Sequence, residues 1–440
     1  MSVDPSSRPP AAFSRQLGLG VAGLFFLALL ASVARWGVDV PYWDQWVLVH
    51  HLESLERGTL DVAELWAPHN EHRLLLPKAL MLGLASVSGW DIRLELWVHL
   101  AFALALFAAA LALMRRTAGE LPGWLVALSG ASIFGLAQWH NWSWGWQSQI
   151  FLNVLLVTAG LAVLAGEGRF RVPLAAACGA AATCSFATGL LFWPLAAPLA
   201  WRGEPRGRGL RLAAWAAASA AMIGLYLWGL PPSEEMRQTL GPGASLKLFL
   251  GYVSVYLGGS LLPFDGRTAL FGAPLLALPW LILAAPTLLS RRRFARALPL
   301  LLWAAYGVGS AALTALGRLP AGGIGQALSS RYITISQVFW LGLFALAAGL
   351  ERGDFSPSRL EDGGWRRRLR RFSAAAVALA LGIGGAFGAL EMRDQARERS
   401  EIRRQILAGT VSDASLERLE ALGLGLYRGK ERPPASATPR

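Results

Sequence analysis

Charge is scarce in this 440-residue chain: Asp, Glu, Lys and Arg make up 16% of it, while hydrophobic residues make up 54%. A soluble globular domain carries about 25% charged residues, so this composition excludes an ordinary soluble protein. Apolar runs of roughly 18 residues recur from end to end, and each is long enough to cross a bilayer core. The chain is therefore predicted to be an all-α, polytopic integral membrane protein.

Cysteine is rarer still, since Cys178 and Cys184 are the only two and both lie in apolar sequence. They are expected to be small packing residues, and no disulfide framework is indicated. The formal net charge is +13, but nearly all of it is arginine between apolar runs, and no nucleic-acid-binding motif accompanies it. Arginine is therefore expected to set the orientation in the membrane, and no nucleic-acid partner is expected.

The apolar runs predict about 11 transmembrane helices with the N-terminus inside. Single spans are expected at 17–35, 96–114, 124–138, 150–166, 212–230, 270–290, 297–316, 333–350 and 373–390, and a hairpin of two short spans at 172–201. The first run has full span length and no small-residue cleavage site, so it is expected to be an anchor. Two shorter apolar pieces, 74–88 and 247–262, are assigned to the membrane interface. This assignment keeps the Arg-rich loops on the inner side, as the positive-inside rule requires.

Two parts follow from this topology: a multi-span membrane domain, 1–390, and a polar C-terminal tail, 391–440. The tail is expected to hold two short helices and a disordered end. The outer-face loops are 37–95, 138–149, 231–269 and 317–332, and the first of them is expected to contain interfacial helices. The unusual polar residues gather in these loops, so an active site is expected on the outer face. An Ala- and Arg-rich composition suggests a bacterial inner membrane, with this face towards the periplasm.

Asp44, in "VPYWDQW", is the first candidate functional residue. One interpretation makes it the N-cap of an amphipathic helix over 45–57. The other makes it a general base at the membrane surface, with a pKa that its aromatic neighbours help to raise.

The second candidate is "PHNEHR", which holds His69, Asn70, Glu71, His72 and Arg73. The two histidines, three residues apart, could share a helix face and bind a metal ion with Glu71, although no strong metal motif is present. The alternative is that the histidines and Arg73 bind a phosphate or a sugar.

Further basic residues near the outer ends of the apolar runs are Lys78, Arg318 and Arg331, the last followed by Tyr332. The arginines are either ordinary flanking charges or a clamp for a lipid phosphate, for which a guanidinium is well suited.

The third candidate is "QWHNWSWGWQSQ". Its tryptophans suit an interfacial aromatic belt. They also suit carbohydrate, because indoles stack on sugar faces while amides hydrogen-bond the hydroxyls. The residues expected to contact a sugar are His140, Asn141, Trp142, Trp144 and Gln147.

The order of these parts resembles the C-type glycosyltransferase superfamily (GT-C), including its bacterial members. The resemblance rests on an acidic residue just past the first span, then "HRLLLPKAL" and "GWDIRLELW", then a span ending in "MRR". It covers roughly residues 15 to 210 in layout, and the motifs are loose. The family often carries an acidic pair in the first loop, whereas this chain has Asp44 followed by Gln45, and it has His72-Arg73 where the family has His-Pro.

The resemblance implies an inverting glycosyltransferase that takes a sugar from a polyprenyl-phosphate carrier on the outer face. Asp44 would then be the catalytic base, with Glu71 as a second acidic residue. No cofactor is certain, and a divalent cation stays open. The expected partners are the lipid-linked sugar donor, a glycan, lipid or protein acceptor, and membrane lipids. A surface-polysaccharide polymerase or ligase, a transporter or flippase, and a non-catalytic scaffold are the alternatives.

Overall fold

The computed structural model describes residues 11–202, 207–241, 245–351 and 364–410. Within these ranges it contains helices and no strand, apart from one isolated β-bridge. Eight of the described helices are long and apolar enough to cross a membrane. They are α1 (Ala11–Trp36), α5 (Ile92–Ala118), α8 (Ser148–Ala165), α11 (Arg208–Leu227), α14 (Gly266–Leu288), α15 (Arg291–Gly322), α16 (Ile333–Glu351) and α17 (Gly364–Leu407). The prediction of an all-α, multi-pass membrane protein is confirmed.

Three shorter helices occupy the remaining expected spans: α6 (Gly123–Ile133), α9 (Arg171–Thr183) and α10 (Phe192–Ala200). The 3₁₀ turn η5 (Ala187–Leu191) joins α9 to α10, so residues 171–200 form the expected hairpin. Its tip contacts the first loop, because the amide of Leu76 donates to the carbonyl of Cys184 at 3.2 Å.

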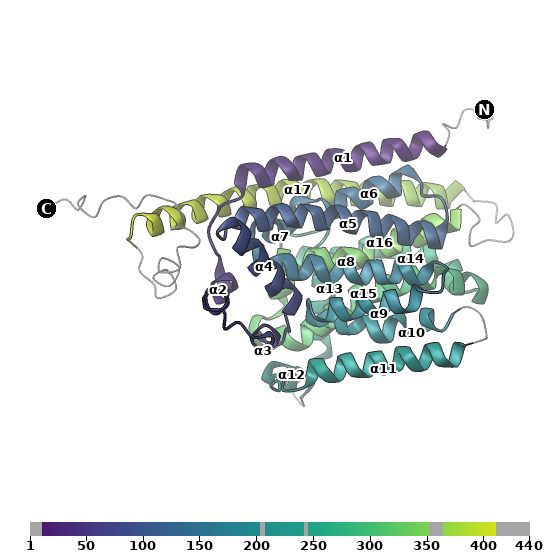
Figure 1. The fold of residues 1–440 in the computed structure, drawn as a ribbon. Helices are drawn as coiled ribbons and strands as arrows, with labels where there is room; N and C mark the ends of the chain where they lie inside the picture. The colour runs from purple at the N-terminus through teal and green to yellow at the C-terminus, as the bar shows by residue number, and fades with distance from the viewer. Residues whose placement is uncertain (1–10, 203–206, 242–244, 352–363, 411–440) are drawn as a thin grey trace.

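Short helices of the first loop and of the connection after α11 gather at one end of the bundle, at the left of Figure 1, which we call the loop face. It carries α2 (Leu48–Glu56), α3 (Val62–Trp66), α4 (Leu75–Ser88) and α12 (Glu234–Leu240). The connections from α5 to α6, α8 to α9 and α14 to α15 lie at the opposite end, and arginines occupy the adjoining helix ends, among them Arg115 and Arg116 in α5 and Arg291, Arg292 and Arg293 in α15. The helix α13 (Leu246–Gly258) packs between α14 and α15.

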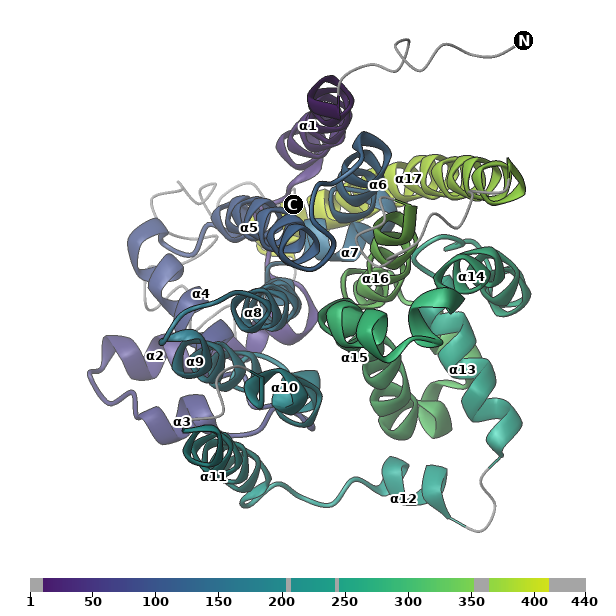
Figure 2. The ribbon, with the colours of Figure 1, turned by 90° about the vertical axis from the view of Figure 1, so that its right-hand side faces the viewer.

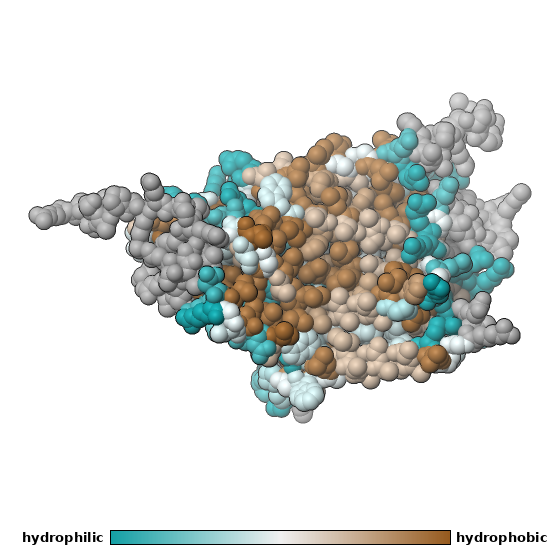
Figure 3. All heavy atoms as spheres, in the orientation of Figure 1, coloured by the Kyte–Doolittle hydropathy of each residue, from teal (hydrophilic) through white to brown (hydrophobic). Residues whose placement is uncertain are grey.

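An apolar band lies between these two polar ends on the face of the molecule that Figure 3 shows. The spans differ in how deeply they lie in the bundle: 94% of the apolar window of α16 is buried, against 11% of that of α11. The core of the bundle therefore lies around α16, and α11 and α1 run along its outer edges (Figure 2).

Small residues set the close approach of α1 to α6. A Cβ added at Gly18 would overlap the carbonyl of Gly123, and one added at Gly130 would overlap Ala22. Spans pack closely where such residues allow their backbones to meet, because lipid provides no hydrophobic force between them. This contact holds the first span against the bundle and fixes where the loop after Trp36 begins.

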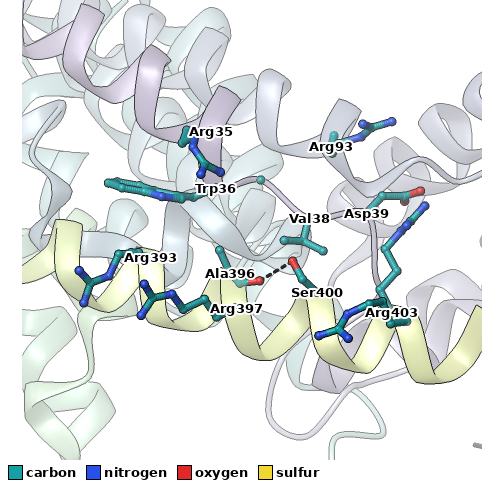
Figure 4. Close-up of a pocket in the computed structure, with 12 residues that line it drawn as sticks. Arg35, Trp36, Val38, Asp39, Arg93, Arg393, Ala396, Arg397, Ser400 and Arg403 are labelled. Carbon is teal, nitrogen blue, oxygen red and sulfur yellow. Dashed lines mark hydrogen bonds between the residues drawn. The ribbon is translucent and has the colours of Figure 1, made fainter.

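The polar tail departs from the sequence-based expectation. Residues 391–407 do not start a separate short helix but continue the last span as the outer part of α17, a single helix of 44 residues. Residues 411–440, including the expected disordered end, lie outside the described residues. The outer part of α17 lies at the loop face, beside the loop that follows α1 (Figures 1 and 4).

Candidate functional site

The segment "HNEH" forms a tight turn rather than a helix. The backbones of His69 and His72 bond each other in both directions, at 2.8 and 3.0 Å. Asn70 sits between them at a φ of 53°, a left-handed conformation that Asn tolerates better than most residues. The expectation that both histidines share a helix face is therefore wrong.

Aromatic side chains hold the two histidines of this turn. The ring of His69 packs edge-on to Trp146, with centroids 5.1 Å apart. The ring of His72 stacks on Phe186, at the tip of the hairpin, with centroids 4.1 Å apart. Burial lowers the pKa of His72 to about 4, so this histidine is neutral at physiological pH.

Asp44 lies in the 3₁₀ turn η2 (Trp43–Val47), and its carboxylate faces the same turn. Its Oδ2 is 3.7 Å from Nε2 of His69, and its side chain is 40% exposed. It caps no helix, because the N-cap positions of η2 and α2 are Tyr42 and Val47. The N-cap interpretation of Asp44 is therefore wrong.

The pKa of Asp44 is shifted in the direction opposite to the one expected. Its interaction with His69 lowers the pKa, and the charges of Arg331 and Arg318 lower it further, so that they outweigh burial, which raises it. Aromatic neighbours do not set this pKa, because cationic groups from distant segments reach the carboxylate. Asp44 is consequently ionised at neutral pH.

Glu71 accepts from the guanidinium of Arg318, at the loop-face end of α15. Nε2 of His72 lies 3.3 Å from the same carboxylate oxygen, Oε1. Glu71 and Arg318 are both about one-third exposed, at 37% and 32% of their side chains. The turn therefore carries two acid–base pairs, one on each of its histidines.

Arg73 and Lys78 donate hydrogen bonds to backbone carbonyls and so hold the loop in place. The guanidinium of Arg73 donates to the carbonyls of Tyr226 at 2.7 Å, Trp66 at 2.9 Å and Trp228. Nζ of Lys78 donates to the carbonyl of Ala67 at 3.1 Å, and burial lowers the pKa of Lys78 to about 8. Both side chains are nearly inaccessible, at 3% and 2% exposed, so neither presents its charge to a ligand in this conformation.

Segment 138–149 folds inward through α7 (Trp139–Ser143) and the 3₁₀ turn η4 (Gly145–Gln147). Trp142 and Trp144 are 0% and 1% exposed, and their indoles donate to the carbonyls of Gly135 and Tyr42, both at 2.9 Å. Neither indole lies at the lipid surface or has a free face for a sugar. The exposed aromatic ring here is Trp43, which is 59% exposed and stacks on Tyr42.

His140 and Asn141 join this segment to the 3₁₀ turn η7 (Ser330–Tyr332). The ring of His140 bonds the hydroxyl of Ser330 at 2.9 Å, and the amide of Asn141 donates to the carbonyl of Arg331 at 3.1 Å. Burial lowers the pKa of His140 to about 3. These contacts place Arg331 beside the first loop.

The side chain of Arg331 lies over the ring of Tyr332, with 5.2 Å from guanidinium carbon to centroid. It forms no ion pair with any described residue. Tyr332 itself is 5% exposed, and its hydroxyl accepts from Gln326 at 2.8 Å. Arg331 is therefore the cation near Asp44 whose charge is not neutralised by a described carboxylate.

Gln147 is 1% exposed, and neither its amide nitrogen nor its oxygen has a hydrogen-bond partner among the described residues. An unpaired buried amide costs about 1–3 kcal/mol, so such a group is normally satisfied by water or a ligand. Gln147 fits a binding role, although it does not reach the Asp44 pair through any described contact.

Sequence reasoning missed Glu95. It lies in the first turn of α5, is 2% exposed, and accepts from the amide of Gln45 at 2.8 Å. Gln45 is the residue next to Asp44, so Glu95 fixes the backbone neighbour of the candidate base. An ionisable residue at the start of an apolar run was the available signal.

No group of three His, Cys, Asp or Glu side chains in the described ranges is placed to hold a metal ion. The carboxylate of Asp44 faces His69, and the carboxylate of Glu71 faces Arg318 and His72. The residues present therefore do not fit a divalent cation.

Comparison of the chain with protein-family models, curated proteins and solved structures finds no match. The likeness to the GT-C superfamily consequently rests on the sequence features alone.

Proposed function

We propose that the protein is a membrane glycosyltransferase that moves a sugar from a polyprenyl-phosphate carrier to an acceptor hydroxyl at the loop face. The observation that carries the proposal is the juxtaposition of an ionised, accessible Asp44 with the charges of Arg318 and Arg331. The first loop supplies Asp44, and the much later segment 318–331 supplies both arginines. Activation of the acceptor hydroxyl requires a base, and departure of the phosphate requires cations close to that base.

Asp44 is assigned the role of general base. The acceptor hydroxyl gives its proton to the carboxylate as its oxygen attacks the anomeric carbon, and the carbon–oxygen bond to the phosphate breaks. The phosphate leaves with the electron pair. Because the pKa of Asp44 is lowered, proton transfer is favourable only when the new bond to carbon is well formed, since the hydroxyl becomes acidic at that stage.

Arg331 is assigned to the phosphate, because it has no carboxylate partner in the described part of the chain. A guanidinium can bind two phosphate oxygens at once and stabilises the charge that develops on the leaving group. Arg318 adds a second cation, and Glu71 positions it through their ion pair. We therefore give Glu71 a positioning role rather than that of the base.

We propose that the loop face lies on the periplasmic side of a bacterial inner membrane. Support for this orientation comes from the arginines at the helix ends that adjoin the opposite connections, which favour the inner side, whereas the arginines in the outer part of α17 lie on the loop face. A polysaccharide polymerase or ligase would use the same base and cations, so the product distinguishes it from a single-sugar transferase.

The test compares cell-surface glycans, by mass spectrometry, in a deletion strain complemented with wild type, Asp44→Asn or Arg331→Ala. Asp61→Asn is the matched control, because Asp61 caps α3 in the same loop and Asn caps equally well. We expect wild type and Asp61→Asn to restore a sugar that Asp44→Asn and Arg331→Ala do not, at equal membrane abundance. Full restoration by Asp44→Asn would show that Asp44 is not the base.

A further inference from the structure

A cavity of about 840 Å³ lies on the loop face between the end of α1, the start of α5 and the outer part of α17 (Figure 4). It is separate from the Asp44–Glu71 turn, since none of the residues of that turn line it. Its volume falls within the range of about 300–1,000 Å³ that is usual for small-molecule sites.

Arginine dominates its lining. The six arginines are Arg35, Arg93, Arg393, Arg397, Arg403 and Arg404, and Asp39 is the carboxylate among the lining residues. Carboxylates outside the cavity neutralise some of this charge: Asp91 pairs with Arg93, Asp394 with Arg393 and Arg397, and Glu401 with Arg404.

Arg35 and Arg403 form no ion pair with any described residue. Clustered like charges repel one another and destabilise the fold unless an anion compensates them. The two walls of the cavity, α1 and α17, therefore each present a guanidinium that lacks a described carboxylate partner.

The spacing of the α17 residues gives the cavity its shape. The lining residues 393, 396, 397, 400, 403 and 404 recur every three or four positions, so they form one stripe on the helix. From Arg393 to Arg404 this stripe extends about 16 Å along the axis. A single inorganic phosphate would fill only a small part of such a site.

The cavity is held open by apolar contacts at its outer end. Val40 and Ile406 are each 2% exposed, and Val38, Ile402 and Trp46 pack around them. This small cluster fixes the outer part of α17 to the loop after α1. The cavity also lies where two membrane spans end, since Arg35 is in the last turn of α1 and Arg93 in the first turn of α5.

We propose that this cavity is a binding site for a phosphate-bearing polyanion. Guanidinium groups on two walls would bind the phosphate oxygens, and Arg35 sets the inner limit of the site at the membrane surface. The proposal does not depend on the transferase chemistry. A lipid headgroup and a soluble diphosphate both carry phosphate groups that arginines can bind. The cavity lies at the ends of two spans, so a lipid headgroup is within its reach.

The test uses the full-length chain purified in a neutral detergent. Native mass spectrometry measures binding of cardiolipin, which carries two phosphates, and of zwitterionic phosphatidylcholine, and competition by sodium pyrophosphate. The variants are Arg35→Gln, Arg403→Gln and the double variant. Arg237→Gln is the control, because Arg237 is an exposed arginine of α12 that does not line the cavity.

We expect cardiolipin to bind wild type and Arg237→Gln equally. Each cavity variant should weaken binding about tenfold, the effect of losing one charge-assisted hydrogen bond. Lysine at both positions should restore much of the affinity, which separates charge from folding. Pyrophosphate binding as tight as that of cardiolipin would support the site and assign it to a soluble ligand. Equal binding by the double variant, or equal binding of phosphatidylcholine, would overturn the proposal.

Discussion

Gly145 is the position at which a single methyl group most directly tests how the candidate base is supported. A Cβ added there would overlap Oε2 of Glu95 and come within 2.6 Å of Nε2 of Gln45. These two atoms form the buried 2.8 Å hydrogen bond below Asp44. The φ of Gly145 is not in the left-handed region, so Gly145→Ala introduces no backbone strain and acts through this clash alone.

The expected cost has two parts. Inserting a methyl group into a packed core costs about 1–3 kcal/mol. Breaking the bond to Gln45 costs about 1–3 kcal/mol more, because Glu95 is buried and its carboxyl group would lose a partner. A lower apparent Tm, by roughly 2–6 °C for a chain of 440 residues, should result, and sugar transfer should fall as Gln45 displaces the adjacent Asp44.

The assay is thermal unfolding of the purified variants in detergent. Gly23→Ala is the matched control, because a Cβ at Gly23 meets nothing within 4 Å and alanine favours a helix. Adding Gly145→Ala to a Glu95→Ala background should cost little, since the clashing carboxylate is gone and the amide of Gln45, no longer held by it, can turn away. The reasoning is refuted if Gly145→Ala is as stable as wild type, or if it costs the same with and without Glu95.

Three further predictions concern the turn and its anchors. Arg73→Gln should lose three bonds to carbonyls and cost about 3 kcal/mol or more, seen as faster proteolysis within residues 59–72; unchanged cleavage would contradict this anchoring. A double-mutant cycle on Glu71→Ala and Arg318→Ala should give a stability coupling of about 1 kcal/mol or less, because both groups are one-third exposed; a larger value would mean a desolvated pair. Burial lowers the pKa of His72 to about 4 and of His140 to about 3, from 6.5, so the unfolded chain binds more protons below pH 6.5. Apparent Tm should therefore fall as pH drops from about 6.5 to 4, and His140→Gln should flatten this dependence; a Tm independent of pH in that window would refute it.

The membrane fold was predictable from hydrophobicity, because span length and charge placement are local properties of the sequence. The break at "CSFATG" marked the hairpin, and Pro77 with Lys78 marked 74–88 as a segment that does not span. The course of α17 was not predictable in the same way. The arginines after residue 390 predicted that the helix ends there. In the structure the helix continues, and several of these arginines line the cavity.

Which residues would form the candidate site was only partly visible. Asp44, His69, Glu71 and Arg318 were identified by residue type, and the structure brings them together. The burial of Trp142 could not be foreseen, because it depends on segment 138–149 folding inward against α5 and α17.

Long-range contacts also decided what the charged groups of the first loop do. The roles of Arg73 and Lys78 depend on carbonyls that only the folded loop exposes to them. The lowered pKa of Asp44 likewise depends first on its contact with His69, which the fold of the loop sets, and then on arginines supplied by α15 and η7, more than 270 residues away. Spacing within a single segment reveals none of these contacts.

The most direct test of the central claim is the rate at which the purified protein transfers a labelled sugar from polyprenyl phosphate, measured for Asp44→Asn against Asp61→Asn. Asn keeps the shape of the side chain but accepts no proton, so the claim predicts a rate lower by about 10²-fold or more for Asp44→Asn alone. Folding of both variants is checked by their apparent Tm. Equal rates in a protein that transfers sugar would show that another group takes the proton, and Asp44 would then have no catalytic role.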